Sequence, residues 1–277
     1  MLALYAHDRG PAIASKTTLA IAIEALAAFW GDLTCDAVKG ATCRAYERHR
    51  AKPRRLVDGR TVAAGSSTVR RELGVLQAAM NHAHAEGVLI YPLKVTLSES
   101  GEPRDRWATR DEVARLLLAA APHCRRFILL SIYTGRRAQA VLDLTWTQVD
   151  LDLGMIRFKQ GRETKKRRGS IRIPPRLLAH LRRWRERDGR KSMFVVPRPS
   201  RTSSIRRAFE GARERSGVTD VTPHVLKHTA ITWAIMKGLS VEAAAEYFDT
   251  SPETIRKHYW HHSPHHQAEA VEIIGRK

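Results

Sequence analysis

Residues 222–262 constrain this chain more than any other stretch, because they carry two helix starts of the same design. Thr222 is followed by Pro223, and Ser251 is followed by Pro252. Threonine and serine are favoured N-caps, and proline is favoured at the first helical position because it has no N–H to leave unpaired. We therefore expect one helix to begin after residue 222 and another after residue 251, with their faces meeting if the chain folds back between them.

Chemically capable side chains lie on both predicted helices. His224 and Lys227 are three residues apart in the first helix, so they share a face. Tyr259 falls two turns into the second helix. A free tyrosine hydroxyl has a pKa of about 10 and needs an adjacent base or cation to attack. The stretch therefore predicts a nucleophile, a proton-transfer group and a cation for phosphate in one cleft.

Two stretches further upstream complete a pattern in three boxes. Residues 134–146 read TGRRAQAVLDLTW, residues 164–174 read TKKRRGSIRIP, and residues 224–229 read HVLKHT ahead of Tyr259. Together they resemble the boxes of the tyrosine recombinases, or phage-type integrases. That family has Thr-Gly-x-Arg-x-x-Glu-Leu-x-x-Leu-x-Trp, then a hairpin lysine before a proline, then His-x-x-Arg-His-Thr, Leu-Gly-His and a tyrosine. Three boxes in this order are far more specific than any one alone, and the resemblance covers most of the chain.

The resemblance implies a mainly α fold with a small antiparallel sheet (α+β), in which a helical core-binding domain is joined to an integrase-type catalytic domain. We place the helical, DNA-binding domain at residues 1–92 and the catalytic domain at residues 107–277. Residues 93–106 are polar and without periodicity, which predicts an interdomain linker.

Hydrophobic periodicity and capping signals locate the expected elements. A capping box, Thr109 to Glu112, precedes one of the helices. Residues 51–66 are expected to form a basic loop. The expected helices span residues 18–30, 36–50, 68–86, 113–121, 127–133, 175–187, 205–215 and 268–274, and the expected strands span residues 154–160, 169–173 and 193–196.

The resemblance also implies a reaction and a role for each matching residue. Tyr259 would attack a DNA phosphate, forming a 3′-phosphotyrosyl link that conserves the energy for rejoining. Arg137 would hold the non-bridging oxygens, and His224 would assist deprotonation of the tyrosine. Lys166 would protonate the leaving 5′-oxygen. Lys165 is its rival, because neighbouring residues on a strand face opposite sides.

Three positions depart from the family's pattern. Ala140 stands where a glutamate is expected after the arginine, and Lys227 replaces the second phosphate-binding arginine. Thr250 takes the place of a histidine or tryptophan before the tyrosine, and alignment on the Gly-His dipeptide gives Asp249 instead. Lys227 and Thr250 remain candidate catalytic positions. These changes bear on activity more than on the fold.

The charge of the chain favours a nucleic-acid partner. Its 277 residues include 48 Lys and Arg against 28 Asp and Glu, which gives a formal net charge of +20. So large an excess points to a polyanion, most commonly a nucleic acid, and the resemblance implies double-stranded DNA. For Arg70 and Arg71 the alternative is a solvated charged face. The side chains expected to contact phosphates are Arg70 and Arg71 on the helix at 68–86, Arg136 at a helix start, and Lys165, Arg167 and Arg168 in the basic hairpin.

Other features argue against a membrane, a disulfide framework and a metal. No apolar run is long enough to span a bilayer, and the first residues are too polar for a signal peptide. The odd number of cysteines, without metal spacing, suggests reduced thiols in a cytoplasmic protein. As a protein expected to act on DNA, it would be nucleoid-associated. Neither a metal nor another cofactor is expected, although the C-terminal histidines include pairs that zinc could bind: His258, His261, His262, His265 and His266.

The leading interpretation is a site-specific DNA recombinase that works as a homotetramer on two DNA sites. Its C-terminal tail would dock on a neighbouring protomer, and an accessory DNA-bending protein or excision factor is a further candidate partner. Two alternatives stay open. One is a recombinase-fold DNA-binding protein with weakened or lost catalysis, and the other is a type IB topoisomerase-like enzyme that relaxes supercoils.

Overall fold

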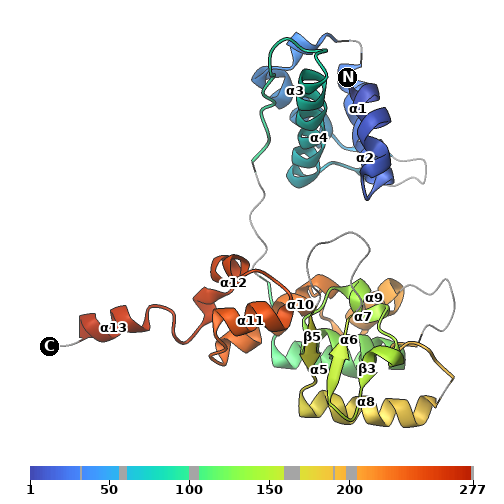
Figure 1. The fold of residues 1–277 in the computed structure, drawn as a ribbon, viewed down its shortest axis with the longest axis vertical. Coiled ribbons are helices and arrows are strands. Elements are labelled where there is room, and N and C mark those ends of the chain that lie inside the picture. The colour runs from blue at the N-terminus through green and yellow to red at the C-terminus, as the bar shows by residue number, and fades with distance from the viewer. Residues whose placement is uncertain are drawn as a thin grey trace. The chain divides into compact units, whose positions relative to one another are not determined.

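The computed structural model describes residues 1–31, 33–55, 61–99, 106–158, 169–189, 191–197 and 205–275 (Figure 1). The chain forms two compact units, residues 1–103 and residues 104–277. Each unit has its own hydrophobic core. Within the described ranges, no helix combines the length and the apolarity needed to cross a bilayer.

The first unit is a bundle of helices around α4 (Figure 1). Leu73 and Leu76 of α4 are buried against Leu26 of α2, as the apolar periodicity of both segments predicts. The helices of this unit are α1 (Leu2–Arg9), α2 (Lys16–Trp30), α3 (Gly40–Ala51) and α4 (Ser66–Ala85).

A buried polar network ties α3 to α4. The Tyr46 hydroxyl donates to a carboxylate oxygen of Glu72 at 2.7 Å, and the guanidinium of Arg50 grips both oxygens of that carboxylate at 2.7 and 2.9 Å. Glu72 is only 1% exposed, so its charge is stable there only because it is paired and hydrogen-bonded. Burial, followed by the contact with Glu72, raises the pKa of Tyr46, which keeps its hydroxyl protonated as a donor.

The segment after α4 packs back onto the same unit. Val95 is 3% exposed and belongs to the core, and its N–H donates to the side-chain oxygen of Gln77 at 2.7 Å. Arg70 of α4 donates to the carbonyl of Ser98. Residues 93–98, which we expected to begin the linker, therefore lie along α4.

The second unit holds the remaining helices and a three-stranded antiparallel sheet, which confirms the predicted fold class. Helix α6 packs along α10, and α5 packs along α9. These helices are α5 (Arg110–Ala119), α6 (Pro122–Thr134), α7 (Ala138–Leu142), α8 (Pro175–Asp188), α9 (Ile205–Ser216), α10 (Pro223–Met236), α11 (Val241–Phe248), α12 (Pro252–His258) and α13 (Ala268–Gly275).

The sheet follows the alternation expected of half-buried strands. Ile156 and Ile171 are partners across two strands and are both buried, whereas Arg157 and Arg172 face outward. The strands run in the order β3 (Val149–Asp150), β4 (Met155–Arg157) and β5 (Ser170–Arg172). The strand predicted at 193–196 is wrong, because this segment makes only an isolated bridge from Phe194 to Thr145.

Two further predictions in the first unit need correction. The segment predicted as a loop at 51–66 contains an antiparallel pair, β1 (Arg54–Arg55) and β2 (Thr61–Val62). The helix predicted to begin at residue 36 begins at Gly40, because residues 35–37 form a separate turn of 3-10 helix. Both differences concern very short elements: a two-residue strand pair, and a 3-10 turn closed by bonds from the N–H groups of Ala37 and Val38 to the carbonyls three residues earlier.

An ion pair inside the second unit joins α6 to the end of α8. The Arg126 guanidinium donates to the two carboxylate oxygens of Asp188 at 2.5 and 2.7 Å and to the carbonyl of Val195 at 3.0 Å. Both side chains of the pair are nearly buried, with 4% and 11% of their surfaces exposed. The hydrogen bonds from Arg126 hold the pKa of Asp188 below its usual range.

Candidate active site

Helix α10 places two histidines on one face. Its N-cap is Thr222, whose hydroxyl accepts from the N–H of Val225, and Pro223 occupies the first helical position, as predicted. His224 and His228 are one turn apart, and their Nε2 atoms lie 3.0 Å from each other. One hydrogen bond therefore joins the two imidazoles.

Tyr259 meets this face from the other end of the segment. Helix α12 is capped by the Ser251 hydroxyl, and Tyr259 is its C-cap residue, so it lies at the end of the helix rather than within it. The tyrosine is 4% exposed and packs in a cluster with buried residues of α10 and α11. Its hydroxyl oxygen lies 2.7 Å from Nδ1 of His228. The predicted nucleophile is thus held against an imidazole, but that imidazole is His228 and not His224.

A tight turn brings the Thr-Gly-Arg-Arg box to the same region. Helix α6 ends at Gly135, which has φ +57°. A Cβ built on this glycine would lie 2.4 Å from a ring carbon of Phe248, the last residue of α11. Only glycine fits so close an approach with this backbone conformation. The next residues of the box, Arg136 and Arg137, are consequently delivered beside the end of α11.

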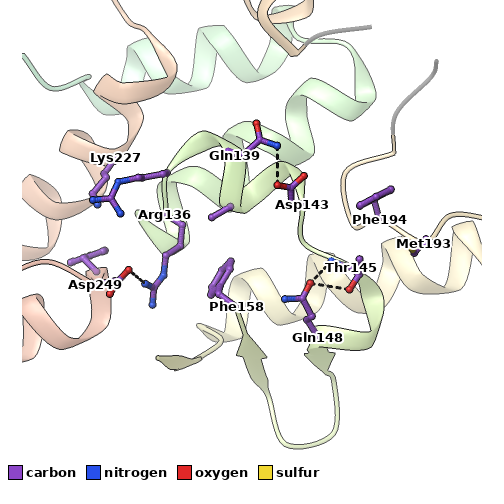
Figure 2. A pocket seen from close by; sticks show the side chains of 13 residues that line it. Arg136, Gln139, Asp143, Thr145, Gln148, Phe158, Met193, Phe194, Lys227 and Asp249 are labelled. Atoms are coloured by element: carbon purple, nitrogen blue, oxygen red, sulfur yellow. Dashed lines mark hydrogen bonds and ion pairs between the residues drawn. The ribbon is translucent and has the colours of Figure 1, made fainter. Parts of the chain in front are cut away.

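These two arginines and Lys227 line a cavity of about 480 Å³. Arg136 is 4% exposed, and its guanidinium lies 3.2 Å from a carboxylate oxygen of Asp249 and stacks over the ring of Phe158 (Figure 2). Arg137 is the exposed N-cap of α7. The cavity wall therefore holds three cationic side chains, and Asp249 matches the charge of Arg136.

Asp249 has an unusual backbone. It is the C-cap of α11, with φ +53° and ψ +57°, a left-handed conformation that Asp tolerates better than most residues. Its carboxylate is the one that contacts Arg136, which we predicted as a DNA contact. Burial and this ion pair favour a role for Arg136 in holding α7 to the end of α11.

The electrostatics of His224 link it to the cationic groups. Partial desolvation of the ring lowers its pKa, and the charges of Lys227 and Arg137 lower it further. His224 is therefore neutral at pH 7 in this state, so its ring can accept a proton. Arg137 and Lys227 also line the cavity described above, so the charges that act on His224 are those of its wall.

The structure thus connects four of the predicted catalytic residues: Arg137, His224, Lys227 and Tyr259. The side chain of the fifth, Thr250, takes part in none of these contacts, and its backbone N–H donates to the carbonyl of Ala245 in the turn after α11. The sixth, Lys166, lies outside the described residues, as do Lys165, Arg167 and Arg168. Of the two arginines predicted on α4, Arg71 is exposed and Arg70 is bonded to Ser98.

His228 was not among our predicted site residues. The signal that identifies it is its spacing, because a residue four positions after His224 lies on the same helix face. No group of three or more metal-ligating side chains occurs among the residues that the structure describes.

Residues 106–266 match the sequence model of the phage integrase family. The chain belongs to this family. The resemblance drawn from the three boxes is therefore confirmed, and the match extends through the residues of the candidate site from Arg137 to Tyr259.

Two curated members of the family illustrate how far the similarity extends. The tyrosine recombinase XerA of Thermococcus kodakarensis is 30% identical over 148 residues, which is 50% of this chain and 51% of the relative. The integrase of Salmonella phage P22 is 21% identical over 227 residues, covering 76% of this chain and 58% of the relative. The chain thus spans between half and three-fifths of the length of these relatives.

Solved integrases share the fold. A lambda integrase dimer bound to a COC′ core site aligns with a TM-score of 0.71 at 19% identity, covering 94% of this chain and 75% of that one. The Tn1549 transposon integrase, solved in complex with circular intermediate DNA, also aligns with a TM-score of 0.71, at 15% identity and over 100% of this chain and 99% of that one.

Proposed function

We propose that this protein is a site-specific DNA recombinase that cuts and rejoins strands through a covalent 3′-phosphotyrosine at Tyr259. The observation that carries the proposal is the contact of 2.7 Å between the Tyr259 hydroxyl and an imidazole nitrogen of His228. The ring is buried in an apolar cluster, which fixes the direction of the hydroxyl.

The cations that line the cavity suit a phosphodiester. Arg137 can give two parallel hydrogen bonds to the non-bridging oxygens, and Lys227 can add a point charge. Together they would stabilise the charge that builds up on the phosphorane-like transition state. Lys166, or its rival Lys165, is proposed as the proton donor to the leaving 5′-oxygen.

The overall charge supports double-stranded DNA as the partner. With a net charge of +20, the chain has many Lys and Arg side chains that can contact phosphates beyond the active site. We assign residues 1–103 to core-site binding and residues 104–277 to catalysis, with the exposed Arg71 as one phosphate contact of the first unit. As proposed, the reaction conserves the phosphodiester energy in the tyrosyl link and calls for no cofactor.

A multimer on DNA is part of the proposal. Lambda integrase has been solved as a dimer on a core site and as a tetramer on a Holliday junction. In this chain α13 exposes Val271, Ile273 and Ile274, with 60% to 83% of each residue accessible. We assign this apolar surface to docking on a neighbouring protomer of a homotetramer. An accessory DNA-bending protein or excision factor would be a separate partner outside the tetramer.

The test is covalent capture on a nicked suicide substrate, from which the cut end diffuses away before it can be rejoined. We expect a protein–DNA adduct with the wild type and none with Tyr259→Phe, which loses only a hydroxyl and should bind DNA as the wild type does. Adducts that persist in Tyr259→Phe would move the nucleophile elsewhere.

The same assay separates the alternatives. DNA binding without any adduct would favour a DNA-binding protein that has lost catalysis, consistent with Ala140, Lys227 and Thr250 at positions where the family has other residues. Relaxation of supercoiled DNA without strand exchange would favour a topoisomerase-like enzyme.

A further inference from the structure

Three titratable side chains form an unbroken line from the buried tyrosine to an exposed histidine. Tyr259 Oη lies 2.7 Å from His228 Nδ1, and His228 Nε2 lies 3.0 Å from His224 Nε2. Both contacts have the length of a hydrogen bond, and His228 uses one ring nitrogen in each. His224, at the outer end, is exposed.

The acid–base strengths of these groups set the direction of the hydrogen bonds. A phenol is a better donor than a neutral imidazole, and an imidazole nitrogen is a better acceptor than a phenol oxygen. The Tyr259 hydroxyl therefore donates to Nδ1 of His228. A neutral His228 then carries its hydrogen on Nε2 and donates it to Nε2 of His224. Each hydrogen in the line points away from the tyrosine.

We propose that His228 accepts the Tyr259 proton directly and passes its own Nε2 proton to His224, so that the two histidines relay the proton to the surface. The relay rests on the function proposed above and makes His228 a catalytic residue that the family boxes did not lead us to select. It also changes the role of His224 from direct base to the outer member of a pair.

The proton transfers and the strand cleavage conserve atoms and charge. As Tyr259 Oη forms its bond to phosphorus, the Oη–H proton moves to Nδ1 of His228, and the Nε2 proton of His228 moves to His224. His228 ends neutral with its hydrogen on the other nitrogen, and His224 ends as an imidazolium. The bond from phosphorus to the 5′-oxygen breaks, and that oxygen takes a proton from the lysine assigned to it.

The surroundings of His224 make the relay depend on bound DNA. The charged groups that act on it in the described structure are Lys227, on the same helix, and Arg137, ahead of α7. Both cations disfavour protonation of the His224 ring while no substrate is bound. A phosphate held between these cations offsets them, so His224 becomes a better proton acceptor when the substrate is in place. The tyrosine would then be activated only on DNA.

The test uses a suicide substrate made in two forms, one with the natural 5′-oxygen and one with sulfur in its place at the scissile bond. A thiolate leaves without being protonated, so the sulfur substrate reports on the nucleophile's side of the reaction alone. The key variant is His228→Asn, whose amide oxygen can still accept a hydrogen bond from Tyr259 but cannot take its proton. His180→Asn, a half-buried histidine on α8, is the matched control.

We expect His228→Asn to slow formation of the adduct by about 10²–10⁴-fold on both substrates. His224→Gln should slow both by at least about tenfold, because it removes the final acceptor. The control should cleave both substrates as the wild type does.

Two results would overturn the relay while leaving the proposed function intact. One is wild-type cleavage by His228→Asn. The other is a defect of this variant that disappears on the sulfur substrate, which would place His228 at the leaving group. If His228→Asn does not fold, as judged by thermal unfolding, His224→Gln decides, and undiminished cleavage by that variant refutes the relay. Absence of adduct with the wild type, or its persistence in Tyr259→Phe, would instead refute the proposed function.

Discussion

Gly135 offers a direct test of how the first box is held against the end of α11. The substitution Gly135→Ala adds one methyl group at a residue with φ +57°, where that methyl would lie 2.4 Å from a ring carbon of Phe248 and 2.8 Å from the next. Real Cβ atoms do not approach another carbon so closely. Either the buried Phe248 ring or the turn that carries Arg137 must move.

The cost has two parts that can be estimated separately. An alanine in the left-handed region costs about 1–2 kcal/mol relative to its preferred conformations. Forcing a methyl group into a packed site costs about 1–3 kcal/mol more. We therefore expect Gly135→Ala to lower the free energy of unfolding of the second unit by about 2–5 kcal/mol.

Gly217→Ala is the matched control. Gly217 lies in the same unit with φ +68°, but no atom beyond its chain neighbours lies within 4 Å of the Cβ position. The control bears the backbone cost of about 1–2 kcal/mol but not the overlap of the methyl group with Phe248. Alanine also stiffens the unfolded chain, and the resulting gain in stability is common to both variants. The difference between the variants, about 1–3 kcal/mol, isolates the contact with Phe248.

Urea denaturation followed by tryptophan fluorescence measures this difference. Trp30 is the tryptophan of the first unit, and the others report on the second. Adding Phe248→Ala to Gly135→Ala should relieve the overlap, so the double variant should lose less stability than the sum of the two single variants. If Gly135→Ala costs no more than Gly217→Ala, the close packing of this turn on α11 is refuted.

Three further outcomes are expected. Lys227→Ala should reduce cleavage of a suicide substrate by about 10²–10³-fold, whereas Lys227→Arg should keep or raise it; full activity of the alanine variant would make Lys227 an ordinary surface charge. The folded-state pKa of Asp188 is lowered by Arg126, so this pair stabilises the protein above the unfolded pKa of about 3.9 and stops doing so as the pH falls through the folded value. Acid titrations of stability should therefore lose part of their slope below about pH 4 in Asp188→Asn, and an unchanged slope would contradict the pairing. DNA affinity, measured by fluorescence anisotropy, should fall steeply between low and physiological salt, and a flat response would argue against phosphate contacts as its main source.

The sequence alone determined the features that depend on short-range chemistry. The helix starts at Thr109, Thr222 and Ser251 were predicted from capping residues, and in each the side-chain hydroxyl accepts the expected backbone hydrogen bond. The turn at Gly135 and the buried alternation of Ile156 and Ile171 likewise follow from local signals. A cap, a left-handed glycine and a strand period involve only residues a few positions apart, so a single sequence carries them.

Only the tertiary structure decided which side chains meet. His224 and His228 share a face of α10, and nothing local says which of them receives Tyr259, which is 31 residues from His228. That choice depends on how α11 and α12 return the chain to α10 and on the direction in which each side chain leaves its helix. The pairing of Arg136 with Asp249 has the same origin, since a buried charge is matched only when distant segments pack around it.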